Sequence, residues 1–181
     1  MQSFIELAKK RRSTRVYDPR PIDRKDLDTC VEAALLSPSA CNSQPWKFII
    51  IDDASLKESI SSRVITGRYS MNTFASGAAA FIAVVAEPVK LPSWVGGKLR
   101  GTDFQKIDLG IACENLCLEA EDLGIGTCML GWFNERRLKK MLKVPRSRKI
   151  ELLISLGYPT PREVPNRRLK EREEVLSHNK Y

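Results

Sequence analysis

The spacing of hydrophobic positions changes several times along the chain, which predicts helices alternating with short strands. After a first short helix at residues 2–11, Asp23 can cap a second helix that ends before Pro38, because the residue preceding a proline disfavours helical geometry. In this second helix the apolar residues recur at i, i+3, i+4, i+7 and i+8. This spacing predicts one buried stripe, made of Leu27, Cys30, Val31, Ala34 and Leu35.

Apolar runs predict four strands, at residues 46–51, 81–86, 127–130 and 150–156. Further helices are expected at residues 56–63, 103–123 and 134–142. Residues 64–77 suggest a loop with one helical turn, and residues 91–101, rich in Pro, Gly and Trp, suggest a loop. Strands interleaved with helices in this way indicate an α/β or α+β domain of three layers.

The helix expected at residues 103–123 is apolar almost all round, so it must be buried on several sides. In a chain of 181 residues, which is the size of one domain, a second subunit could cover one of these sides. The tail from Tyr158 is too polar to form a core. We therefore expect a single domain over residues 1–181, whose tail at 158–181 is extended and packs on the surface or on a partner subunit.

The composition, with 43% apolar and 29% charged residues, is typical of a globular protein. The longest apolar run, residues 78–86, is well below the roughly 20 residues that a membrane-spanning helix needs. The N-terminus has no signal-peptide core, so a cytoplasmic location is expected.

Cysteine and histidine offer little material for catalysis or metal binding. Five cysteines without a secretory signal argue against a disulfide framework, and the pair Cys113 and Cys117 is better explained by core packing than by a metal or redox site. The single histidine, His178, lies four residues from the C-terminal end, which leaves no partner for a Ser-His-Asp or Cys-His mechanism. No catalytic side chain and no metal site are expected.

The charge balance is strongly basic, with a net charge of +8 and a pI near 9.4. The basic residues cluster at 9–15 and at 136–149, and three explanations are open: solvated helix faces, nucleic-acid binding, or contacts to a phosphorylated cofactor. No Walker motif is present. The glycines at Gly124 and Gly126 open a strand instead of a helix, so they are not a dinucleotide fingerprint.

Four segments, in order along nearly the whole chain, resemble the FMN-dependent nitroreductase family. They are Arg-Arg-Ser-Thr-Arg at residues 11–15, Pro-Ser-Ala-Cys-Asn-Ser-Gln-Pro-Trp at 38–46, the run from Asp108 to Gly131, and the closing Leu-Gly-Tyr-Pro at 156–159 with its arginine-bearing tail. The resemblance implies a three-layer α/β/α sandwich around a mainly antiparallel sheet. It also implies a homodimer with one FMN in each of two interface clefts, and NADH or NADPH as co-substrate.

The resemblance also assigns roles to residues. Residues at the ribityl-phosphate end of the flavin would be Arg11, Arg12 and Ser13, with Arg168, or else Arg167, from the tail. Arg15 would lie beside the N1/O2 edge, where a cation stabilises the reduced flavin. Residues near the ring would be Asn72, Met129, Leu130 and Gly131 from the same chain.

The loop at residues 38–46 would reach across the interface in such a dimer. Residues lining the partner's flavin would be Pro38, Ser39, Ala40 and Asn42, with Gln44 supporting the loop and Trp46 in the core. Family members often carry a basic residue just after the Asn72 position, whereas Thr73, Phe74 and Ala75 follow here.

Three functions follow as hypotheses. The first is an FMN oxidoreductase that takes hydride from NAD(P)H through flavin N5 to an electron-poor small molecule such as a nitroaromatic or quinone, by ping-pong chemistry. The second keeps the fold for dehalogenation, flavin destruction or a ring-forming oxidation. The third, from another class, is a basic nucleic-acid-binding domain that uses residues 136–149.

Overall fold

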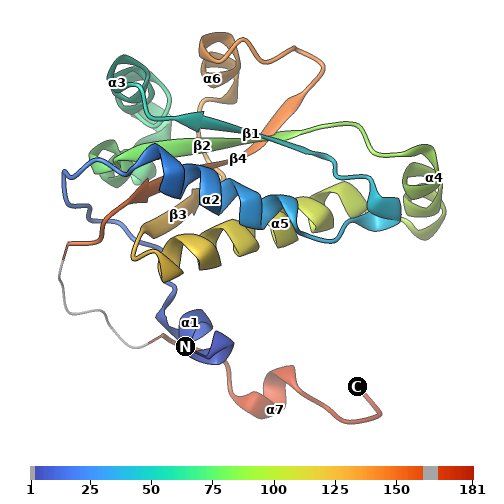
Figure 1. Cartoon of the computed structure of the whole chain (residues 1–181). Coiled ribbons are helices and arrows are strands. Elements are labelled where there is room, and N and C mark those ends of the chain that lie inside the picture. The colour runs from blue at the N-terminus through green and yellow to red at the C-terminus, as the bar shows by residue number, and fades with distance from the viewer. Residues whose placement is uncertain (1–2, 161–166) are drawn as a thin grey trace.

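One antiparallel sheet forms the centre of the computed structural model, which describes residues 3–160 and 167–181. Its strands lie in the order β1-β2-β4-β3 (Figure 1). Their bounds are β1 Trp46–Ile51, β2 Ala80–Ala86, β3 Gly126–Leu130 and β4 Lys149–Gly157. All four predicted strands are confirmed, and no end differs from its predicted position by more than one residue.

Strand β2 lies between β1 and β4 and is buried on both faces. Ile82 and Val84 point to one face, while Phe81 and Val85 point to the other, as the two-residue period of a strand requires. Each large apolar side chain buried here contributes about 1.5–3 kcal/mol. The sheet therefore has a hydrophobic core on each side.

Helices cover both faces, which confirms the three-layer architecture. Helices α2 (Arg24–Leu35) and α5 (Phe104–Asp122) pack on one face. The other face is covered by α3 (Ala54–Arg63), η2 (Gly67–Gly77) and α6 (Glu135–Met141) (Figure 1). The remaining helical segments are α1 (Phe4–Lys10), η1 (Ala40–Asn42), α4 (Leu91–Arg100) and α7 (Arg172–Val175).

The buried stripe of α2 is narrower than predicted. Leu27, Cys30 and Ala34 are completely buried, but Leu35 is 51% exposed. Leu35 belongs to the last turn of the helix, and the adjacent Leu36 is 86% exposed. The end of α2 has therefore left the core before Pro38.

The prediction of a loop at residues 91–101 was wrong, because residues Leu91–Arg100 form helix α4. Pro92 sits in the first turn, where its missing N–H costs nothing, and Gly101 ends the helix with a left-handed φ of 69°. Residues 64–77 also hold more regular structure than the one turn expected, since η2 is a 3-10 segment of 11 residues.

Helix α5 is buried along most of its circumference, as its sequence predicted, but one face remains open. Ile107 is 49% exposed and Ile111 is 37% exposed on this face. The described part of the tail, residues 167–181, is exposed throughout, and residues 161–166 lie outside the described residues. Within the described ranges, the structure contains no helix long and apolar enough to cross a membrane.

Candidate functional site

The segment that carries the first arginine cluster is fixed across the ends of β3 and β4. Ser13 forms a parallel bridge with Thr127, and the N–H of Thr14 donates to the Thr127 carbonyl over 2.8 Å. The Tyr17 hydroxyl lies 2.8 Å from the Thr14 carbonyl and 2.8 Å from Ser155 Oγ. Residues 13–17 are therefore held at both ends.

Two glycines make this close crossing possible. A Cβ placed on Gly126 would come within 2.3 Å of Thr14 Oγ1, and one on Gly157 within 2.7 Å of Tyr17 Cδ1. Real Cβ atoms do not approach neighbours so closely, so any larger residue would push the segment off the strands. The glycines of β3 and β4 thus set the position of the neighbouring arginines.

Two of the arginines expected at the phosphate end, Arg11 and Arg167, contact each other. Arg11 Nε lies 2.9 Å from Glu114 Oε1 on α5, and Arg167 donates from Nη2 to the Arg11 carbonyl. Arg12 is half-buried. Burial raises the pKa of Glu121, and the positive charges of Arg11, Lys10 and Arg12 oppose that rise. Arg168 is exposed.

Arg15 lies where the first segment, η2 and β3 meet. Its guanidinium carbon is 5.7 Å from the centre of the Phe74 ring, and its Nη1 donates to the Ser13 carbonyl over 3.4 Å. Burial raises the pKa of Cys128 on β3, and the positive charge of Arg15 opposes that shift. Phe74, one of the three residues that follow Asn72, therefore lies close to a cation.

Asn72 joins η2 to the end of β3. Its side chain is buried, and Nδ2 donates to the Trp132 carbonyl over 2.6 Å. The Trp132 indole in turn donates to the Arg68 carbonyl over 3.1 Å. This network borders Gly131, which is exposed and has no heavy atom closer than 4.0 Å to the position of a Cβ. Before it on β3, Met129 is half-buried and Leu130 is buried.

The loop at residues 38–44 is anchored to α5 at a different place. The N–H of Ala40 donates to both carboxylate oxygens of Asp108, at 3.1 Å each. Ser39 Oγ accepts from the Gln44 N–H over 2.9 Å, and Gln44 Nε2 donates to Asn42 Oδ1 over 2.9 Å. Gln44 supports the loop, as expected from the sequence, whereas the anchoring role of Asp108 was not foreseen.

This loop carries backbone strain. Cys41, Asn42 and Gln44 have φ values of 53°, 49° and 48°, in the left-handed region that residues other than glycine rarely occupy. Such conformations persist only where the surroundings over-determine them, and they cluster at functional sites. The exposed side chains of Asn42 and Gln44 are therefore presented by a rigid, strained turn.

Within one chain, the two groups of predicted site residues remain apart. In the described ranges, no hydrogen bond or ion pair joins residues 38–44 to residues 11–15 or 129–131. Residues 11–15 contact β3 at Thr127, η2 at Phe74 and the tail at Arg167, and Asn72 bonds to Trp132 just after β3. The loop at 38–44 instead lies beside the start of α5, next to α4.

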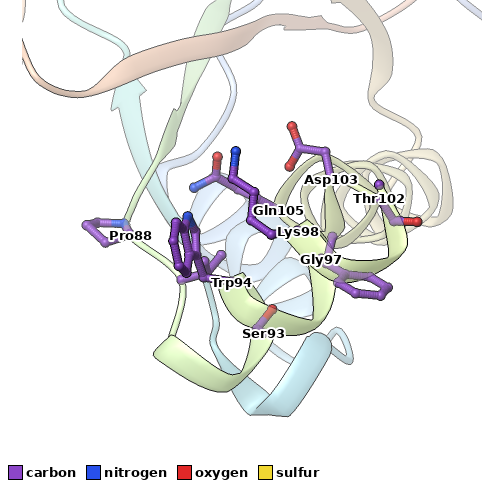
Figure 2. Close-up of a pocket in the computed structure, with 11 residues that line it drawn as sticks. Pro88, Ser93, Trp94, Gly97, Lys98, Thr102, Asp103 and Gln105 are labelled. Atoms are coloured by element: carbon purple, nitrogen blue, oxygen red, sulfur yellow. The ribbon is translucent and has the colours of Figure 1, made fainter.

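A cavity of about 630 Å³ opens between α4 and the first turn of α5 (Figure 2). The sequence does not predict this cavity, because Pro, Gly and Trp at residues 91–101 suggest a loop. The signals that could have revealed the helix were Pro92 near its start and Gly101 at its end. Ser93, Trp94, Lys98 and Gln105 are among the residues lining this cavity.

The remaining candidates are structural. Cys113 and Cys117 are buried in the core, where burial raises the pKa of Cys113 to about 12 and that of Cys117 to about 11, and Trp46 is also buried. The part of the chain that the structure describes holds no cluster of three potential metal ligands. In the basic region, Lys139, Arg148 and Lys149 pair with glutamates at 3.0, 2.6 and 2.8 Å.

Known proteins resemble this chain over most of its length. Among curated proteins, the "Putative NADH dehydrogenase/NAD(P)H nitroreductase" of Archaeoglobus fulgidus is 35% identical over 163 residues, covering 88% of this chain and 87% of the relative. An iodotyrosine deiodinase of Thermotoga neapolitana is 23% identical over 201 residues and covers all of both chains.

Solved structures share the fold. A nitroreductase family protein from Clostridium novyi NT is 31% identical, with a TM-score of 0.76 over 88% of this chain and 86% of the other. A structure described as an oxidoreductase containing FMN matches 99% of this chain and 95% of the other, with a TM-score of 0.77 at 22% identity. The family model described as "Nitroreductase family" matches residues 8–158. The chain therefore belongs to the nitroreductase family.

Proposed function

We propose that this protein is an FMN-dependent oxidoreductase that transfers electrons from NADH or NADPH to an electron-poor small molecule such as a quinone or nitroaromatic. The observation that carries the proposal is the gathering of Arg11, Arg12 and Arg167 beside Ser13, with Arg15 further along the same segment. Such an arrangement suits a ligand with a dianion at one end and a ring that gains negative charge at the other.

The donor groups at the phosphate end fit FMN. Arg11 pairs with Glu114 through Nε. The two terminal nitrogens of its guanidinium are therefore left for a phosphate. Arg12, the Ser13 hydroxyl and the tail arginines Arg167 and Arg168 would add further donors. The carboxylate of Glu114 holds Arg11 in place, at the cost of offsetting part of its charge.

The residues near the expected ring also fit. FMN, when bound, supplies the two-electron chemistry, accepting hydride from NAD(P)H and passing it to the acceptor. Arg15 would lie at the edge where negative charge develops, and Met129 and Leu130 would present the end of β3, just before Gly131. Gly131, with open space on its exposed side, allows a planar group to approach the backbone, and Asn72 keeps that backbone fixed through Trp132.

The proposed active form is a homodimer in which Pro38, Ser39, Ala40 and Asn42 of one chain line the flavin of the other. Exposed apolar side chains supply a contact surface for a second copy. They lie on α1, at the end of α2, on α5 and in the tail, and include Phe4, Ile5, Leu36, Ile107, Ile111, Leu169 and Val175. A homodimer would cover this surface and join the two groups of site residues that one chain keeps apart.

The reaction needs no side-chain acid or base in this proposal. The only histidine, His178, lies in the exposed tail. For a quinone, NAD(P)H and one proton from solvent give NAD(P)⁺ and the hydroquinone; for a nitro compound they give NAD(P)⁺, the nitroso compound and water. The residues of this chain serve to bind, to orient and to stabilise charge.

A second candidate function is reductive dehalogenation in the same cleft. The relatives named iodotyrosine deiodinase, which match 97–100% of this chain at 23–25% identity, support it. Turnover with a panel of quinones, nitroaromatics and halogenated phenols would separate the two, because only the dehalogenase releases halide.

The first test is the visible absorbance of the purified protein, reconstituted with FMN and then mixed with NADH or NADPH without oxygen. Flavin bands that bleach on mixing are expected. Bound flavin that does not bleach would contradict NAD(P)H as the electron donor. A protein that does not bind FMN at all would overturn the proposed function and return attention to the basic residues at 136–149.

A further inference from the structure

Helix α4, which borders the cavity between α4 and α5, exposes apolar residues and turns small ones inward. Leu91, Val95 and Leu99, spaced along one side of α4, are 70%, 41% and 86% exposed. The side turned inward instead carries Ser93 and Gly97, which are both buried. The small side chain of Ser93 leaves room in the cavity of about 630 Å³. Gly97 instead allows close packing, because a Cβ there would lie 2.7 Å from the Thr102 carbonyl oxygen.

Ser93 gives the cavity a buried polar group. Its side chain is 4% exposed and its hydroxyl has no hydrogen-bond partner among the described residues. Figure 2 shows this hydroxyl on the inward side of α4, facing the start of α5. A buried hydroxyl without a partner is destabilising, so a residue that serves only to pack would be apolar at this position. The hydroxyl is available for a polar atom of a ligand.

The rim of the cavity combines an aromatic ring with a free cation. Lys98 Nζ lies 6.0 Å from the centre of the Trp94 ring, one helical turn away on α4. Within the described ranges Lys98 forms no ion pair, whereas the carboxylate of Asp103 is 3.3 Å from Lys106 Nζ. Among the described residues, the charge that lines this cavity without a counter-charge is therefore the positive charge of Lys98.

Gln105 adds an oriented amide on the same side. Its Nε2 donates to the Glu87 carbonyl over 2.6 Å, which fixes the side chain and leaves Oε1 as an acceptor. In Figure 2 the side chains of Trp94, Lys98 and Gln105 lie on the same side of the cavity. The walls thus offer a flat apolar surface, a cation and two neutral polar groups.

We propose that this cavity binds a planar aromatic compound with an anionic substituent, such as an aromatic carboxylate, as the electron acceptor. The ring would stack on Trp94, and the anionic group would pair with Lys98. The acceptor role rests on the proposed function. Ser43 Oγ accepts from the Lys90 N–H over 3.2 Å, and this bond ties the start of α4 to the loop that we assign to the partner's flavin.

Calorimetric titration of the oxidised, FMN-loaded protein with para-nitrobenzoate and para-nitrobenzyl alcohol tests the charge preference. The two probes share the ring and differ in charge, and about tenfold tighter binding of the carboxylate is expected. Lys98→Gln should reduce this ratio to about one by weakening only the carboxylate. Arg100→Gln removes the same charge from the same helix, at an exposed residue that does not line the cavity, and should leave the ratio unchanged.

Ser93→Ala gives a second, independent readout. Removing an unpartnered buried hydroxyl should leave the melting temperature unchanged or raise it, yet weaken para-nitrobenzoate binding about threefold to tenfold. Equal affinity for both probes, or a preference that Lys98→Gln and Arg100→Gln reduce equally, would overturn the inference. A preference that depends on Lys98 in a protein that binds no flavin would support the cavity as a binding site and overturn the proposed function instead.

Discussion

The backbone N–H of Ala40 donates to both carboxylate oxygens of Asp108, and these two residues join the strained loop to the longest helix. Asp108 is only 4% exposed. Burial raises the pKa of this carboxyl, and the bond from Ala40 opposes part of that rise. The loop is therefore anchored by a carboxylate in an environment that disfavours its charged form.

A raised pKa in the folded state has a definite consequence for stability. The folded protein holds the Asp108 proton to higher pH than the unfolded chain does, so the contribution of this group to stability is largest below the ordinary pKa of an aspartate. It declines as the pH rises through the raised pKa. Asp108→Asn removes the charge, and wild type should lose stability relative to this variant as the pH rises above the ordinary aspartate pKa of about 4, as measured by urea denaturation.

Asp53 provides a control of opposite sign. The N–H of Leu56 and the hydroxyl of Ser55 bond to its exposed carboxylate and lower its pKa. Its contribution is therefore present above the ordinary pKa and is lost as the pH falls. Relative to Asp53→Asn, wild type should gain stability as the pH rises. The same slope for both variants would contradict the assignment for Asp108.

The adjacent glycines of α4 should respond to alanine in opposite directions. A Cβ on Gly96 meets nothing within 4 Å, so Gly96→Ala should stabilise the protein by about 0.5–1 kcal/mol through the helix propensity of alanine. A Cβ on Gly97 would lie 2.7 Å from the Thr102 carbonyl oxygen, so Gly97→Ala should cost about 1–3 kcal/mol. Chemical denaturation measures both, and equal effects would show that α4 does not pack on residue 102 as described.

Sequence reasoning located the sheet accurately because its strands are short apolar runs bounded by polar or turn residues, as at Trp46–Ile51 and Ala80–Ala86. It failed at α4, where Pro92, Gly96 and Gly97 suggested a chain without regular structure. The proline is compatible with a helix because it falls in the first turn, and Gly97 makes room for the Thr102 carbonyl as a close neighbour.

For the candidate site, the sequence identified segments better than contacts. It named Arg11 and Asn72, but not the pairing of Arg11 with Glu114 or the bond from Asn72 to the Trp132 carbonyl. These partners are about 60 to 100 residues away along the chain, and the three-dimensional fold brings them together. Asp108 was assigned to a helix by its neighbours, and nothing local indicated that its carboxylate would hold residue 40.

Arg11 and Glu114 should affect FMN affinity in opposite directions. Arg11→Ala removes a charged donor that we assign to the phosphate, and the dissociation constant should rise about tenfold to a hundredfold. Glu114→Gln removes the carboxylate 2.9 Å from Arg11 Nε, so the dissociation constant should fall. Titration of the apoprotein with FMN, followed by flavin fluorescence, measures both. Tighter binding by Arg11→Ala would exclude this arginine from the phosphate site.

Arg15 should act on the redox equilibrium of the flavin more than on its affinity. A cation beside the ring stabilises the negative charge that reduction creates, so Arg15→Ala should lower the reduction potential and slow reduction by NAD(P)H. For an exposed charge worth up to about 1 kcal/mol, the shift of a two-electron couple is at most about 20 mV. Potentials measured against a reference dye, with rapid mixing for the rate, provide the data.

Arg20→Ala is the matched control for this prediction. Arg20 belongs to the same segment and also contacts an aromatic ring, since its guanidinium carbon lies 4.1 Å from the centre of the Tyr158 ring. Unlike Arg15, it pairs with Asp18 at 3.1 Å and has no assigned role at the flavin. Its removal should change neither the potential nor the rate. An Arg15→Ala variant with full FMN occupancy and wild-type reduction kinetics would refute the assignment of Arg15 to the ring edge. If the Arg15 charge stabilises the reduced flavin, its loss must change the reduction of the flavin.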